Sequence, residues 1–170
     1  MTADNLPTPT AQLRDADSRL VGLIYDSRPP AAAGDSNWLI AIDGSRCSQQ
    51  AVSEAIRLAN DCRNYRLQMI YVQHWMSREG AENELARRGW TVSQAARQAI
   101  EAAGHAWRLH VVMGEYAESI IRVAEEQRSR GIIIGNRGLG ATTNILIGSV
   151  AEKVIHLSPL PVLLAGQSNH

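Results

Sequence analysis

Excess charge is the first thing that this sequence lacks. Its 17 Lys and Arg residues are balanced by 17 Asp and Glu residues over 170 positions. A neutral chain does not hold nucleic acid or an anionic membrane along a charged surface, so we expect neither as a partner. Lysine is also nearly absent, because Lys153 is the single lysine of the sequence. Chemistry that needs a lysine, such as a Schiff base or a Walker A loop, would have to use that residue.

Cysteine and long apolar runs are scarce as well. The two cysteines, Cys47 and Cys62, lack the CxxC spacing of a metal or redox site, so we expect free thiols. No apolar run approaches the roughly 18 to 20 residues that cross a bilayer. Asp4, Asp15 and Asp17 fall where a signal peptide would be basic and then apolar. We therefore expect a cytoplasmic protein.

Metal-binding patterns are missing too. None of the histidines has HExxH or another ligand spacing, so no protein metal site is expected. Cys47 is predicted in the first turn of a helix, where the helix dipole lowers the pKa of a thiol. Its alternative role is that of a small buried apolar residue. The histidines are His74, His105, His110, His156 and His170.

The chain divides by composition into an arm, one domain and a short tail. Residues 1–36 are rich in proline and small residues, which is typical of an arm or linker. Residues 37–166 have the regular pattern of a domain, and residues 167–170 form a tail. Within the arm, four apolar residues recur at helical spacing, so the arm is either a short amphipathic segment that docks or a disordered tail. These residues are Leu13, Ala16, Leu20 and Ile24.

Short apolar runs alternate with longer segments of helical period after the arm. Five strands are predicted, at Trp38–Ile42, Leu67–Gln73, Trp107–Met113, Gly131–Gly135 and Val162–Ala165. Four helices are predicted between them, at 45–62, 84–103, 115–127 and 144–157, with Gly104 as a helix stop. This alternation predicts a doubly wound α/β fold, with a five-stranded parallel sheet and helices on both faces.

A glycine-rich loop follows the fourth predicted strand. Gly135, Gly138 and Gly140 would let backbone amides approach a phosphate, and the next helix N-terminus adds partial positive charge. The loop is not a Walker A motif, because Ala141-Thr142 follows Gly140, and it lacks the GxGxxG order. The alternative is that these glycines only turn the chain from strand to helix.

Asp43 ends the first predicted strand, at the edge of the sheet where α/β proteins bind ligands. If the strand order is 3-2-1-4-5, Asp43 and the Gly135 loop line the same crevice, with a ribose near Asp43 and phosphates on the loop. Asp43 could instead cap the first helix. Arg137 could neutralise a phosphate or remain solvated.

Three segments together resemble the universal stress protein family. They are Trp38–Ser45, the spacing Gly135-x2-Gly138-x9-Gly148-Ser149, and His156–Leu164, so the resemblance covers about residues 37–166. In that family the glycine spacing distinguishes the members that bind ATP. The resemblance implies that Gly135 and Gly138 face the ribose and phosphates and that Asp43 contacts the ribose. It also implies that Gly148, the Ser149 hydroxyl and the Val150 amide hold phosphate oxygens, and that the Val72 backbone bonds adenine.

The resemblance implies a dimeric sensor or regulator of the stress response that binds ATP, ADP or AMP, with Mg²⁺ carried by the phosphates. The implied homodimer joins through the last strand, Val162–Ala165, and an open sheet edge favours pairing independently. No Glu or His is placed to activate water, so we expect slow ATP hydrolysis at most. The alternatives are a nucleotide-free dimerisation module and an adenine-nucleotide-using transferase. Two departures from the family pattern are Arg130-Gly131 and Leu160, where members commonly have Asp and Cys.

Overall fold

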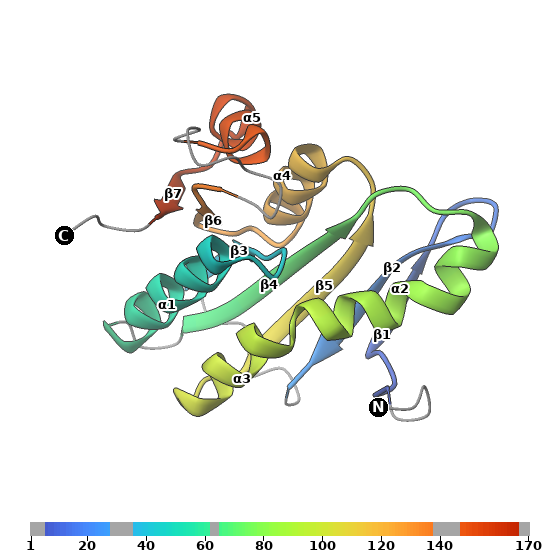
Figure 1. Cartoon of the computed structure of the whole chain (residues 1–170), viewed down its shortest axis with the longest axis horizontal. Helices are drawn as coiled ribbons and strands as arrows, with labels where there is room; N and C mark the ends of the chain where they lie inside the picture. The colour runs from blue at the N-terminus through green and yellow to red at the C-terminus, as the bar shows by residue number, and fades with distance from the viewer. Residues whose placement is uncertain (1–5, 28–35, 62–64, 138–146, 167–170) are drawn as a thin grey trace.

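A seven-stranded sheet with helices on both faces forms the core of the protein (Figure 1). The computed structural model describes residues 6–27, 36–61, 65–137 and 147–166. The strands are β1 (Ala11–Arg14), β2 (Leu20–Asp26), β3 (Ser36–Ala41), β4 (Tyr65–Gln73), β5 (Trp107–Met113), β6 (Gly131–Gly135) and β7 (Val162–Ala165). The helices are α1 (Arg46–Asp61), α2 (Arg78–Val92), α3 (Gln94–Ala102), α4 (Tyr116–Glu126) and α5 (Ser149–Leu157).

The strand order is β1-β2-β5-β4-β3-β6-β7. The five strands from β3 to β7 are parallel to one another, and their relative order is the predicted 3-2-1-4-5. The prediction of a five-stranded, wholly parallel sheet is wrong, because β1 and β2 extend the sheet beyond β5 as antiparallel strands. The sheet is therefore mixed, with the parallel part intact.

The two added strands come from the arm. A docking amphipathic segment or a disordered tail was expected there. Residues 20–26 do dock on the domain, but residues 11–14 and 20–26 are strands and not a segment of helical period or a disordered tail. Leu23 pairs with Val111 of β5 and is buried, as is Tyr25, whose ring lies 5.3 Å from that of Trp90 in α2. Apolar burial against β5 and α2 thus outweighs the helical spacing of the apolar residues in the arm.

Alternate residues of the parallel strands separate two apolar layers. One layer faces α1, α2 and α3, and the other faces α4 and α5 (Figure 1). In β3, for example, Ile40 belongs to the first layer and Leu39 to the second, and both are fully buried. This alternation follows from the two-residue period of a strand.

Some predicted boundaries differ from the structure. α2 begins at Arg78, before the predicted start at residue 84, because the Ser77 hydroxyl accepts a hydrogen bond of 3.0 Å from the Gly80 amide and caps the helix. The single helix expected over 84–103 is two helices that meet at Ser93. Gly104 has φ +80° and follows α3, as predicted for a helix stop. The predicted start of the last helix, at Asn144, lies outside the described residues.

Candidate functional site

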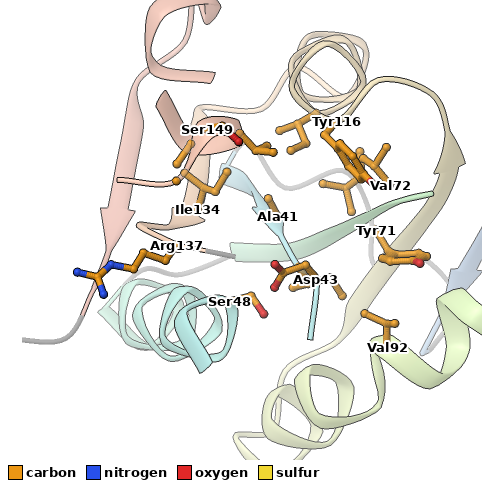
Figure 2. Close-up of a pocket in the computed structure, with 17 residues that line it drawn as sticks. Ala41, Asp43, Ser48, Tyr71, Val72, Val92, Tyr116, Ile134, Arg137 and Ser149 are labelled. Carbon is orange, nitrogen blue, oxygen red and sulfur yellow. The ribbon is translucent and has the colours of Figure 1, made fainter. Parts of the chain in front are cut away.

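A cavity of about 550 Å³ opens at the carboxyl ends of β3, β4 and β6 (Figure 2). It lies at the switch point of the sheet, where β3 has β4 on one side and β6 on the other and their crossovers run in opposite directions. Seven of the residues named from the sequence line it: Asp43, Val72, Gly135, Arg137, Gly148, Ser149 and Val150. Gly138, the eighth, lies outside the described residues.

Asp43 stands between β3 and α1 and points into the cavity (Figure 2). Its Oδ1 accepts a hydrogen bond of 2.9 Å from the Ser45 amide. The cap of α1 is Ser45, whose hydroxyl accepts from the Ser48 amide at 3.1 Å. The alternative role of Asp43 as the helix cap is therefore wrong. The hydrogen bond to the Ser45 amide holds the Asp43 carboxylate near the carboxyl end of β3.

Gly135 ends β6 where α1 passes close by. A Cβ at this position would lie 2.6 Å from the carbonyl carbon of Cys47 and 2.8 Å from its oxygen, so a side chain would collide with the backbone. The glycine thus lets the first turn of α1 pack against the end of β6. Asp43, which precedes α1, and Gly135 consequently lie around the same cavity.

The N-terminus of α5 forms another wall of the cavity. Gly148 caps this helix, and its amide donates to the Asn136 carbonyl at 2.7 Å. Ser149, Val150 and Ala151 follow as the first helical residues, and all three line the cavity. Amides in a first helical turn have no acceptor within the helix, and the dipole adds partial positive charge there. This wall is suited to an anion such as a phosphate.

Aromatic and aliphatic residues form the rest of the lining, and sequence reasoning missed them. Tyr71 of β4 donates its hydroxyl to Gln73 Oε1 at 2.9 Å, and burial raises the pKa of its phenol. Tyr116 begins α4 and is 44% exposed. Tyr71 lies near the carboxyl end of a parallel strand, where α/β proteins bind ligands, so its position in the strand pattern was the available signal. Tyr116 carries no such signal. Other missed lining residues are Ala41, Ile42, Ser48, Ile70, Val92, Ile120 and Ile134.

Basic side chains contribute little to the cavity. Figure 2 draws the Arg137 guanidinium pointing away from Asp43 and Ser149, so the stem of this residue lines the cavity and its charge lies outside. Lys153 of α5 forms an ion pair with Glu118 of α4. This contact raises the pKa of the lysine and lowers the pKa of the carboxyl. Polar recognition in the cavity therefore rests on Asp43, hydroxyl groups and backbone amides.

The described part of the chain offers neither a preformed metal site nor a membrane-spanning helix. It contains no group of three or more His, Cys, Asp or Glu side chains that could hold a metal ion. None of its helices combines the length and apolar character that crossing a lipid bilayer requires. Any divalent cation at the cavity would thus need ligands from a bound molecule as well as from the protein.

The fold and the cavity define a doubly wound α/β protein with a ligand-sized crevice at its switch point. Residues 36–166 match the model of the universal stress protein family, so the chain belongs to that family. A curated relative is universal stress protein YxiE of Bacillus subtilis, which is 27% identical over 147 residues. The alignment covers 76% of this chain and 97% of YxiE.

Solved structures share the fold. The protein MJ0577 of Methanocaldococcus jannaschii aligns with a TM-score of 0.70 and 22% identity, over 81% of this chain and all of that one. The universal stress protein of Archaeoglobus fulgidus in complex with dAMP aligns at 0.61 and 21%, over 76% and 97% of the two chains. An Arabidopsis thaliana family member with AMP bound aligns at 0.60 and 13%, over 79% and 93%.

Proposed function

We propose that this protein binds an adenine nucleotide, ATP, ADP or AMP, in the cavity at the switch point. The observation that carries the proposal is that Asp43 and the N-terminus of α5 line the same cavity. A carboxylate suits the hydroxyls of a ribose, and free helix amides suit phosphate oxygens. The structural neighbours in complex with dAMP and with AMP support the same class of ligand.

The proposed pose follows the chemistry of the walls. Adenine lies among the apolar residues with its edge on the backbone of Val72, and the ribose lies beside Asp43. Phosphates lie on Gly148, the Ser149 hydroxyl and the Val150 amide, and Gly135 faces the ribose and phosphates. The same role is proposed for Gly138, which lies outside the described residues. Arg137 would reach the phosphates only after its guanidinium turns inward. Mg²⁺ would arrive coordinated by the phosphates.

We further propose that binding, and not turnover, is the activity. The cavity lining contains no histidine, lysine or glutamate among the described residues, so none of these side chains is at hand to activate water. ATP hydrolysis would accordingly be slow. A protein of this kind would act in the cytoplasm as a sensor or regulator of the stress response, with nucleotide as its signal.

A homodimer through β7 completes the proposal. β7 ends the sheet, and in the described part of the chain it pairs only with β6. Apolar side chains are exposed on and near it, with Leu164 38%, Ile155 40% and Leu157 53% exposed. An apolar terminal strand favours pairing with a second copy.

Isothermal titration with ATP and AMP tests the site. Ser149→Ala removes the hydroxyl proposed to hold a phosphate, and a hydrogen bond to a charged group contributes about 1.5 to 3 kcal/mol. We expect the dissociation constant to rise about tenfold or more. Ser53→Ala is the matched control, because the Ser53 hydroxyl donates to the Gln49 carbonyl on the surface of α1, at 3.1 Å. Equal affinities for the two variants would contradict the assignment.

Native mass spectrometry of the purified protein distinguishes a nucleotide-binding protein from a nucleotide-free dimerisation module. A nucleotide mass on the dimer, or its uptake when AMP is added, agrees with the proposal. A dimer that stays free of nucleotide at saturating AMP would favour the module instead.

A further inference from the structure

The turn between β1 and β2 presents Arg19 in a fixed direction. Asp15 Oδ1 accepts hydrogen bonds from the amides of Asp17, at 3.0 Å, and Arg19, at 2.9 Å. The Asp15 amide donates to the Arg19 carbonyl at 3.0 Å, and Ser18 adopts φ 60° to close the turn. Asp is suited to such a turn, because its short side chain bonds the backbone two residues ahead.

Arg19 reaches across to the loop that leaves β4 for α2. Its guanidinium carbon lies 5.6 Å from the centroid of the Trp75 ring, within the range of a cation–π contact. The same guanidinium donates a hydrogen bond to the Met76 carbonyl. Arg78, at the start of α2, donates back to the Asp17 carbonyl at 2.8 Å. Two arginines thus link these segments: Arg19 of the hairpin contacts the loop, and Arg78 of α2 contacts the hairpin turn.

The loop in turn contacts the start of α4. The Gly114 amide donates to the Gln73 carbonyl at 3.0 Å, and a Cβ built on Gly114 would lie 3.9 Å from Trp75 Cζ2. His74 Nε2 lies 3.4 Å from Glu115 Oε1, and the His74 ring lies 6.3 Å from the ring of Tyr116.

Tyr116 is a lining residue of the cavity, as are Tyr71 and Val72 at the end of β4 (Figure 2). Contacts therefore run without a break from the hairpin, through residues 74–76, to two walls of the cavity. The walls concerned are those proposed to surround the base.

We propose that Arg19 is a positioning residue for this cavity. It holds residues 74–76 against the start of α4, so that Tyr116 and the end of β4 are already in place when the ligand binds. The inference rests on the proposed nucleotide site for its effect on affinity, whereas the effect on the loop requires no ligand. Preorganising a binding wall increases affinity because less ordering remains to be done on binding.

The apolar core holds this loop at Met76, whereas Trp75 depends more on its contact with Arg19. Trp75 is 51% exposed, so the core does not fix its ring. Removing the Arg19 side chain takes away the cation–π contact and the hydrogen bond to Met76 while leaving β2 and its buried residues in place. We therefore expect residues 74–76 to become more mobile while the fold stays intact.

The test compares Arg19→Ala with Arg14→Ala. Arg14 belongs to the same hairpin, where its Nη1 lies 2.6 Å from Oε1 of Glu82 in α2 and donates to the Ser18 carbonyl of the turn at 2.9 Å. Its removal therefore perturbs the hairpin but keeps the contacts of Arg19 with Trp75 and Met76. Titration with AMP should show an affinity about three- to tenfold weaker for Arg19→Ala, and an affinity within about twofold of the unmodified protein for Arg14→Ala. Arg19→Lys, which keeps the cation, should restore part of the loss. Unchanged affinity in Arg19→Ala would overturn the proposal.

Hydrogen exchange without nucleotide supplies the independent measurement. Arg19→Ala should exchange faster at residues 73–76 and 114–116 than Arg14→Ala, and equal exchange would overturn the positioning role whatever the nucleotide results are. If Arg19→Ala also loosens residues 11–26, then Trp75→Ala, which spares the hairpin turn, must weaken AMP binding to the same degree. Failure of the unmodified protein to bind AMP would overturn the nucleotide site and leave the exchange comparison to decide the role of Arg19.

Discussion

His110 should make the protein sensitive to mild acid. This residue lies in the middle of β5, is 2% exposed, and has its Nε2 2.8 Å from Oε1 of Gln68, which is also buried. The amide oxygen is an acceptor, so the neutral ring carries its proton on Nε2 and donates it. The pKa of His110 is lowered from 6.5 to about 4, chiefly by burial and also by the nearby Arg108, while Asp26 acts in the opposite direction.

The sign of the effect follows from proton uptake. Unfolding exposes His110 and returns its pKa to the ordinary value of 6.5, so the unfolded chain binds the extra proton at pH values where the folded chain does not. The free energy of unfolding is therefore unaffected by this group above pH 6.5 and decreases as the pH falls toward 4. Between about pH 7.5 and about pH 5 the loss amounts to about 2 kcal/mol.

Urea denaturation followed by circular dichroism measures this loss. His110→Gln keeps an N–H donor for Gln68 but does not titrate, so its stability should fall about 2 kcal/mol less than that of the unmodified protein over the same pH range. All other ionisable groups are shared by the two proteins and cancel in the comparison. Equal pH dependence of the two unfolding free energies would refute the argument, whatever the absolute stability of the variant.

Two further substitutions test packing and assembly. In Gly131→Ala the new Cβ would lie 2.4 Å from the Trp38 ring and 2.6 Å from the Pro161 carbonyl oxygen. The free energy of unfolding measured in urea should therefore fall by about 1 to 3 kcal/mol. An unchanged denaturation midpoint would count against the packing described. Leu164→Lys in β7 should convert a dimer to a monomer in sedimentation experiments. Leu13 is similarly exposed and lies in β1, at the other end of the sheet, so Leu13→Lys should leave the dimer intact. The reverse result would place the interface elsewhere.

The parallel part of the fold was predictable because its signals are local. An all-apolar run such as Gly131–Gly135 indicates a strand buried on both faces, and the alternation of such runs with helical segments dictates parallel crossovers. The hairpin was not predicted because the helical spacing of apolar residues in the arm was given more weight than the strand preference of the residues themselves. The run from Leu20 to Tyr25 contains Val21 and Ile24, which favour strands.

The site was partly predictable for a related reason. Asp43 and Gly135 lie 92 positions apart, yet the strand order alone places the ends of their two strands side by side. Tyr116 comes from α4 and carries no motif, so only the packed structure brings it to the cavity. The contact between Arg19 and Trp75 depends on the turn geometry of the arm, which apolar periodicity does not specify. That these residues meet a nucleotide stays a prediction.

A crystal structure of the protein grown with AMP or ATP tests the central claim most directly. The account predicts one nucleotide per chain, with the base beside Val72 and Tyr116, the ribose at Asp43 and the phosphates on the Ser149 hydroxyl and the Val150 amide. An empty cavity at saturating nucleotide, or a nucleotide bound away from the switch point, would contradict it.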